Sequence, residues 1–220
     1  MYFELCHSPE RVERIPVPTI YCVGLNYLEH AQEMQSPRPA EPVIFLKPAS
    51  SILYTGGQIR LPAFAQEVHH EVEVVVAIAK TSGSVSVGQA SELILGYGIG
   101  LDMTLRDVQA RAKAAGKPWS VAKGFATSAP LSTLIPVEHI QAPEALTFQL
   151  SVNGERRQEG SLKDMLFSVP ALIAYLSGIF DLQRGDLIYT GTPAGVGPVH
   201  TGDLLEATLK GYTKLAVSVA

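Results

Sequence analysis

The 220-residue chain has little cysteine, which excludes a fold held together by a disulfide framework. Its two cysteines, Cys6 and Cys22, lie close together in apolar surroundings, and this favours reduced, buried thiols of a cytoplasmic protein. Long hydrophobic runs are also missing: 72–79 and 93–101 are the longest, far short of the roughly 20 residues of a membrane span. The N-terminus lacks the pattern of a signal peptide. We therefore expect a soluble cytoplasmic protein that is not bound to a membrane.

Positive charge is scarce as well. The chain has 17 Lys and Arg against 21 Asp and Glu, a net charge of −4 with histidine neutral. A domain that binds nucleic acid carries a basic patch or stripe, so the composition argues against a nucleic-acid partner. The acidity is too mild to indicate any other class of partner.

Apolar residues are plentiful and occur in many short segments. They make up 46% of the chain, enough for a proper core, and the length fits a single domain, 1–220. Short runs rich in β-branched and aromatic residues predict strands at 19–24, 43–48, 93–101, 203–209 and 212–219. Helical segments are fewer. The expected fold class is therefore α+β, predominantly β.

Local signals define three further elements. Asn153-Gly154 between two strand-like runs predicts a hairpin turn. A helix is expected over 104–115, because Gly116 follows it in the position of a helix stop. Asn26 is expected to cap a shorter helix.

Two glutamates lie in a valine-rich run that predicts a strand. Side chains alternate along a strand, so Glu71 and Glu73 share one face about 7 Å apart, while Val72 and Val74 point to the other. Asp102 ends a second apolar run. Three such carboxylates can converge on one hard cation, and an all-oxygen site suits Mg²⁺ or Mn²⁺. The alternative is that the glutamates lie on a solvated strand face and that Asp102 caps a helix.

His30 and Glu33 form a candidate acid–base pair. Their i, i+3 spacing places them on one face of the short helix. A carboxylate that bonds an imidazole fixes its tautomer and raises its basicity, as a general base requires. The alternative is an exposed pair on a surface helix.

Four polar residues are candidates for contact with an anionic substrate. Arg106 follows Asp102 at the start of the expected helix and can clamp a carboxylate, and Gln109 lies on the same face. Lys123 is flanked by small and apolar residues, so its charge needs a partner. Thr192 lies in the glycine-rich segment GTPAGVG, which lacks the Gly-Lys-Ser/Thr of a nucleotide-binding loop. The alternative is a surface salt bridge for Arg106, an ordinary lysine that extends to the surface for Lys123, and a plain loop for the glycine-rich segment.

The chain also contains a series of recognisable segments: CVGLNYLEHAQEM, PVIFLKP, HHEVEVVVAI, GYGIGLDMTLRDVQ, GKPWSVAKGF, VNGERRQEG and GDLIYTGTPAGVGPV. Together they resemble the fumarylacetoacetate hydrolase family, and most closely its short, single-domain acylpyruvase and oxaloacetate-decarboxylase branch. The resemblance extends over about 20–219. HHEVE, LDMTLRDVQ with WSVAKGF, and TGTPAGVG are highly specific in this order, although none of them is specific alone.

The resemblance implies a mixed β-sandwich roll of the family's C-terminal domain type, a homodimer, and Mg²⁺ or Mn²⁺ held by Glu71, Glu73 and Asp102. It makes His30 and Glu33 the dyad that activates water, on a segment that closes over the site. The positions at which the family contacts its substrate correspond to Arg106, Gln109, Thr192, Lys47 and Lys123, the last of these counted among the catalytic residues.

The expected activity is metal-dependent hydrolysis of the C–C bond of 3-acylpyruvates, such as acetylpyruvate or fumarylpyruvate, to pyruvate and a carboxylic acid. Two alternatives use the same residues on a small 2-oxo acid: decarboxylation of oxaloacetate, and keto–enol or double-bond isomerisation of a related diacid. The shared motifs do not separate these reactions. A metal-binding or interaction protein without catalysis is a further alternative, which gains if His30 and Glu33 lie far from the carboxylates.

Overall fold

The computed structural model describes residues 1–220, and strands dominate it. The chain forms four sheets and five α-helices. Parallel and antiparallel pairs occur together, so the expected mixed, predominantly β architecture is confirmed. The single domain over 1–220 stays a prediction.

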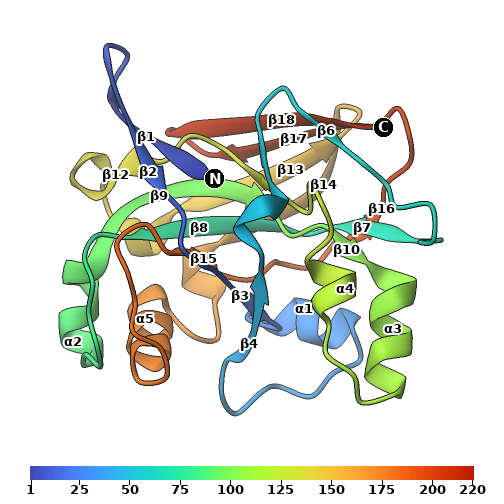
Figure 1. Ribbon diagram of the computed structural model, residues 1–220, viewed down its shortest axis with the longest axis horizontal. Coiled ribbons are helices and arrows are strands. Elements are labelled where there is room, and N and C mark those ends of the chain that lie inside the picture. Colours follow the sequence, from blue (N-terminus) through green and yellow to red (C-terminus); the bar gives the residue numbers. More distant parts are fainter.

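The largest sheet has eight strands and runs through the middle of the molecule (Figure 1). Its order is β4 (Val43–Lys47), β3 (Ile20–Gly24), β15 (Leu187–Tyr189), β8 (Val72–Ile78), β9 (Ile94–Leu101), β11 (Ala129–Leu131) and β5 (Ile52–Tyr54), with β12 (Ile135–Pro136) paired to β9.

Three smaller sheets surround it. The five-stranded sheet has the order β14 (Glu155–Ser161), β13 (Thr147–Val152), β17 (Leu204–Leu209), β18 (Thr213–Val219) and β6 (Gln58–Ile59). The three-stranded sheet has the order β10 (Thr104–Leu105), β7 (Val68–His70) and β16 (Gly197–Pro198). An N-terminal hairpin consists of β1 (Tyr2–Ser8) and β2 (Arg11–Pro16).

The helices are short, and four of the five form two pairs (Figure 1). They are α1 (Leu28–Glu33), α2 (Val87–Ala90), α3 (Arg106–Ala114), α4 (Ser120–Lys123) and α5 (Val169–Ser177). Helices α2 and α5 pack on each other at one end of the molecule, whereas α3 and α4 pack together at the other, near β4 and β10. No helix is long and apolar enough to cross a membrane.

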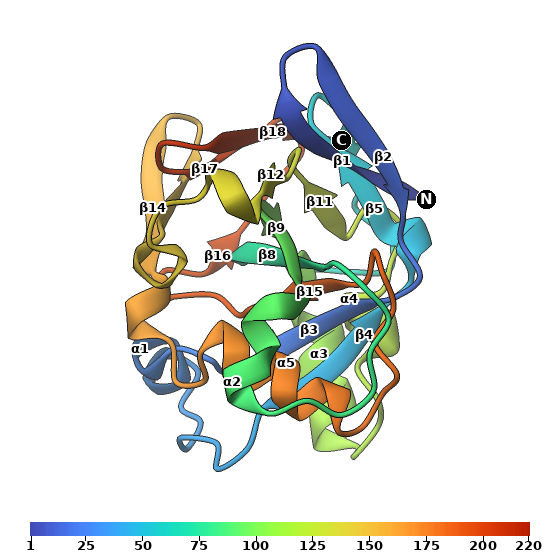
Figure 2. The same cartoon turned by 90° about the vertical axis from the view of Figure 1, so that its left-hand side faces the viewer.

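The central strand β8 is buried on both of its faces. Val72 and Val74 belong to the larger hydrophobic core, which also contains residues of the five-stranded sheet and of α5. Figure 2 shows β17 and β18 on one side of β8 and α5 on the other. Val75 and Ala77 belong to the smaller core, which the β1–β2 hairpin covers. The sequence suggested a strand with one solvated face; the continuous β-branched run instead reflects burial on both sides. Because side chains alternate, Glu73 lies on the Val75 face, inside the protein.

The expected hairpin turn is confirmed, since Asn153 and Gly154 have φ of 52° and 80° and join β13 to β14. The expected cap of the first helix is wrong. Helix α1 begins after Tyr27 without a side-chain cap. Asn26 is fully buried instead: its Nδ2 donates to the carbonyls of Thr190 and Phe167. Asn26 thus ties the entry of α1 to the end of β15 and to the segment before α5.

Candidate metal centre and pocket

The three candidate metal ligands converge because of the register between β8 and β9. Glu71 lies at the break between β7 and β8, Glu73 is the second residue of β8, and Asp102 directly follows β9. In the antiparallel pair Glu73 is opposite Gly100, and the Asp102 amide donates to the Glu71 carbonyl at 2.8 Å. One carboxylate oxygen from each residue lies within 4.8 Å of the others. The expected convergence is therefore present.

All three carboxylates are buried, with exposed fractions of 4% for Glu71, 1% for Glu73 and 0% for Asp102. The solvated strand face that the sequence left open as an alternative is thereby ruled out. Burying ionised carboxylates side by side is unfavourable unless cations accompany them.

Three cationic side chains supply part of that compensation. Lys123 Nζ lies 2.7 Å from Glu71 Oε2 and 2.6 Å from Asp102 Oδ2. Arg106 Nη2 lies 2.5 Å from Glu71 Oε1, and Lys47 Nζ lies 2.8 Å from Asp102 Oδ1. Glu73 has no cation within ion-pair distance and accepts one hydrogen bond, from the Gly191 amide at 2.8 Å. Glu73 is thus the uncompensated member.

The pKa values reflect this asymmetry. Burial raises the pKa of Glu71, but Lys123 and Arg106 outweigh it and the net shift is strongly downward. Burial, with Asp102 and Glu71 adding to it, raises the pKa of Glu73 well above its ordinary value. Burial disfavours the charged form of Lys123, yet Asp102 and Glu71 raise its pKa overall. The pair Lys123 and Glu71 is ionised, whereas Glu73 lacks a positive partner.

The cluster fits a divalent cation with hard oxygen ligands. Its donors are carboxylate oxygens alone, which suits Mg²⁺ or Mn²⁺ better than zinc. Asp102 Oδ1 is buried without a well-aligned hydrogen bond, although Lys47 Nζ is close. An orphaned carboxylate oxygen beside an uncompensated Glu73 is what a bound cation would satisfy.

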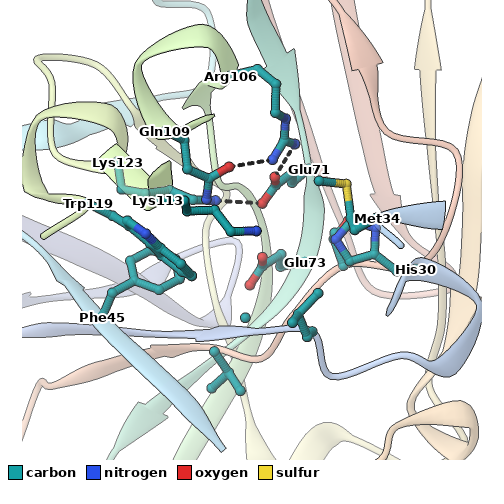
Figure 3. A pocket seen from close by; sticks show the side chains of 14 residues that line it. His30, Met34, Phe45, Glu71, Glu73, Arg106, Gln109, Lys113, Trp119 and Lys123 are labelled. Atoms are coloured by element: carbon teal, nitrogen blue, oxygen red, sulfur yellow. Dashed lines mark hydrogen bonds and ion pairs between the residues drawn. The ribbon is translucent and has the colours of Figure 1, made fainter. Parts of the chain in front are cut away.

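His30 of the dyad faces the same pocket as Glu71 and Glu73. His30 Nδ1 lies 3.0 Å from Glu33 Oε2, and Glu33 Oε1 accepts a hydrogen bond from the Gly195 amide at 3.0 Å. A carboxylate only accepts, so Nδ1 carries a hydrogen, and in the neutral imidazole Nε2 is then the nitrogen with the lone pair. His30 lines the pocket together with Glu71 and Glu73 (Figure 3). The separation that would have favoured a non-catalytic protein is not observed.

Helix α3 presents a polar face to this pocket. Arg106 Nη1 donates to Gln109 Oε1 at 2.7 Å, which confirms that the two side chains are neighbours. Lys113, two helical turns beyond Arg106, also lines the pocket and extends into it (Figure 3). Sequence reasoning missed Lys113, although the i, i+3, i+7 spacing of these residues on one helix face could have indicated it.

Thr192 and Lys47 differ in their access to the pocket. Thr192 lines it, but its hydroxyl donates to the Val72 carbonyl at 2.9 Å and accepts from Gln158 Nε2 at 2.8 Å. Lys47 is 2% exposed and does not line the pocket, because it lies behind Asp102. The expected substrate contact by Lys47 therefore finds no support in the geometry.

Other residues of the site also escaped sequence reasoning. Gln158 is buried and bonds His70, the Val72 amide, Thr192 and the Pro193 carbonyl, so it joins β8 to the 191–195 loop. Phe45 and Trp119 form an aromatic wall with ring centroids 5.8 Å apart. These contacts join residues distant in sequence, and no local pattern marks them.

The sequence and the fold match known proteins. The family described as fumarylacetoacetate (FAA) hydrolase C-terminal matches residues 19–220. The chain belongs to this family.

Two relatives and one solved structure show which proteins this chain is similar to. Oxaloacetate tautomerase FAHD1, mitochondrial, of Bos taurus is 45% identical over 200 residues, 91% of this chain and 90% of that protein. Oxaloacetate tautomerase YcgM of Escherichia coli (strain K12) is 45% identical over 199 residues, 90% of this chain and 91% of that protein. The crystal structure of fumarylpyruvate hydrolase from Pseudomonas aeruginosa in complex with Mn²⁺ and pyruvate has a TM-score of 0.93 and 37% identity, covering 100% of this chain and 96% of that one.

The resemblance found in the sequence is thereby confirmed, as is the fold type that it implied. The chain is a member of an enzyme family whose similar members include oxaloacetate tautomerases and a fumarylpyruvate hydrolase.

Proposed function

We propose that this protein is a divalent-metal-dependent enzyme that interconverts the keto and enol forms of oxaloacetate or a similar 2-oxo diacid. The observation that carries the proposal is the shared pocket: His30 lines one cavity with Glu71 and Glu73, while Glu33 bonds His30 and Asp102 lies beside the two glutamates. Tautomerisation needs one base at a carbon next to a carbonyl and one means of stabilising an enolate, and the pocket holds both.

In this proposal Glu71, Glu73 and Asp102 hold the cation, Mg²⁺ or Mn²⁺. When bound, such a cation acts as a Lewis acid on the 2-oxo group and stabilises negative charge that develops there. The three carboxylates are buried, so they would hold the cation away from bulk water, in surroundings where electrostatic stabilisation is larger than in water.

His30 moves the proton. Its Nε2 takes a proton from C3 of the keto form, the electron pair of that C–H bond becomes the C2–C3 double bond, and the π pair of the C2–O bond moves onto oxygen. His30 then gives the same proton to that oxygen, and the reverse sequence regenerates the ketone. Glu33 bonds Nδ1, so it holds the required tautomer and stabilises the imidazolium that forms.

Cationic and polar side chains opposite His30 receive the carboxylates of the substrate. Arg106, Gln109, Lys113 and Lys123 line that side of the pocket (Figure 3). Several cations suit a substrate with two carboxylates, because each buried anion needs a positive partner. Thr192 also lines the pocket, but its hydroxyl hydrogen is donated to the Val72 carbonyl, so Thr192 offers no free donor to a carboxylate.

Hydrolysis of an acylpyruvate, which the sequence placed first, becomes the second candidate. The relatives named oxaloacetate tautomerase are more similar in sequence than the fumarylpyruvate hydrolase. Hydrolysis remains a candidate because the same dyad can activate a water molecule, and because the hydrolase shares the fold over the whole chain. Decarboxylation of oxaloacetate uses no base, so the dyad gives it no particular support.

The test separates the three reactions by their products. Metal-stripped protein is supplied with Mn²⁺ or Mg²⁺ and given enol oxaloacetate, whose conjugated absorbance is lost on conversion to the ketone, or fumarylpyruvate. We expect metal-dependent loss of enol without release of pyruvate. Pyruvate with CO₂ would identify a decarboxylase, and pyruvate with fumarate a hydrolase. No reaction on either compound would overturn the proposal.

A homodimer and a cytoplasmic location stay predictions. Light scattering of the purified protein tests the first. Microscopy of the tagged protein in its own cells tests the second, and is needed because relatives include proteins named as mitochondrial.

A further inference from the structure

Two lysines neutralise the acidic cluster in different ways. Lys47 approaches Asp102 from behind the pocket, and its ammonium also donates to the carbonyls of Met103, Lys123 and Ser128 and to the Ser128 hydroxyl. Most of its partners are backbone groups that cannot move away without unfolding. Lys47 is a fixed cation of the fold.

Lys123 approaches from the pocket side and has a different set of partners. Its Nζ lies 2.7 Å from Glu71 Oε2, 2.6 Å from Asp102 Oδ2 and 2.7 Å from Thr104 Oγ1. Two of these three acceptors belong to the candidate metal ligands, and no backbone carbonyl holds the ammonium. Lys123 also lines the pocket, so its side chain has space to move into when these contacts are released.

An ammonium group and a divalent cation are therefore competitors for the same carboxylates. Before a metal binds, Lys123 screens the repulsion between Glu71 and Asp102. A cation held by three carboxylates brings two positive charges close to that ammonium, and like charges at such distances in a buried site repel strongly. Arg106 differs, because Glu71 is the only one of the three carboxylates that it contacts, and it is also held by Gln109 and His69.

We propose that Lys123 is an internal counter-ion that stands in for the divalent cation and releases Glu71 and Asp102 when that cation binds. The released ammonium then faces the pocket, where it can pair with a carboxylate of the substrate. Metal binding thus frees a substrate-binding charge, and the two binding events are coupled. This inference rests on the metal site of the proposed function, but not on which reaction follows.

The test compares wild type with Lys123→Met, with and without metal. In the metal-free protein the substitution leaves two buried carboxylates without their shared cation, so we expect the melting temperature to fall by at least about 3 °C. With saturating Mn²⁺ the difference should vanish, because Lys123 no longer contacts these carboxylates. Calorimetry should show Mn²⁺ binding to Lys123→Met roughly tenfold more tightly, since no ion pair has to be broken.

Lys113→Met is the matched control. It removes the same charge from the same pocket, but Lys113 makes no ion pair with the cluster. We expect its Mn²⁺ affinity to stay within about twofold of wild type and its melting temperature to be unchanged.

Three results overturn the inference. The first is an equal loss of melting temperature in Lys123→Met with and without Mn²⁺, and the second is unchanged or weaker Mn²⁺ binding by that variant. The third is a crystal structure of the Mn²⁺-loaded wild type in which Lys123 Nζ still contacts both carboxylates; this structure also decides the question if the variant does not fold. If the wild-type protein binds no Mn²⁺, both the proposed function and this inference fail. Each of the three results above leaves Mn²⁺ binding by the wild type intact and refutes this inference alone, so the two failures are distinguishable.

Discussion

His30 Nδ1 lies 3.0 Å from Glu33 Oε2, and the second oxygen of Glu33 is held by the Gly195 amide. Helix α1 is thereby connected to the loop that also carries Thr192. The dyad is fixed by a group that comes from 162 residues further along the chain than Glu33, so its geometry depends on the folded protein and not on the short helix alone.

The first prediction concerns this dyad. We expect His30→Asn to lower kcat for enol oxaloacetate by about 10²–10⁴-fold, the usual contribution of a proton-transferring group. Glu33→Gln should lower it less, by roughly tenfold or more, because the imidazole keeps a hydrogen-bond acceptor but loses the charge that stabilises its protonated form. Stopped-flow absorbance measures both. Calorimetry should show unchanged Mn²⁺ binding in each; wild-type kcat in His30→Asn would exclude His30 as the base.

The second prediction concerns the uncompensated carboxylate. Glu73→Gln removes the one ligand that no cation accompanies, and we expect Mn²⁺ affinity to fall by at least roughly 100-fold, with loss of metal-dependent turnover. Calorimetry on metal-stripped protein measures the affinity. Glu206→Gln, an exposed change on β17, is the control and should bind Mn²⁺ like wild type. Full metal-dependent activity of Glu73→Gln would refute the ligand assignment.

The third prediction concerns the buried amide that joins β8 to the 191–195 loop. Gln158→Ala leaves the Val72 amide and the Pro193 carbonyl without partners, and we expect a loss of about 2–4 kcal/mol in the free energy of unfolding. Urea denaturation measures it. Gln149→Ala, at a half-buried position of β13, should cost well under half as much. Equal losses in both variants would mean that the hydrogen bonds of Gln158 do not matter.

The fourth prediction concerns pH. Burial lowers the pKa of His70 below its ordinary value of 6.5. Between the lowered pKa and 6.5 the unfolded chain binds a proton at this residue and the folded protein does not, so stability rises with pH across this window and is lost as the pH falls through it. His70→Asn should lose less stability than wild type between neutral pH and about pH 5.5. Urea denaturation of metal-free protein at both pH values checks this, and an identical pH dependence would contradict it.

Part of the site could be predicted from the sequence because its signals are local. The spacing of Glu71 and Glu73, of His30 and Glu33, and of Arg106 and Gln109 is a property of short strands and helices, and the structure shows each pair side by side or in one pocket. The fold type was predicted from the sequence segments that resemble the family and from their order along the chain. The Asn26 cap failed because a buried side chain can satisfy distant backbone groups instead of its own helix.

The sequence by itself predicted the predominantly β fold from its short β-branched segments, and spacing predicted which of the polar residues share a face. Local spacing left the acidic cluster and the dyad open to a solvated alternative, and only the family resemblance assigned them to a metal site and a base. Tertiary structure alone decided that β8 is buried on both faces, that Gln158 supports the pocket, and that Lys47 lies behind Asp102 while Lys123 lies in front of it. The physical reason is that burial, and the pairing of buried charges, depend on contacts between segments far apart in the chain, and no local pattern records those contacts.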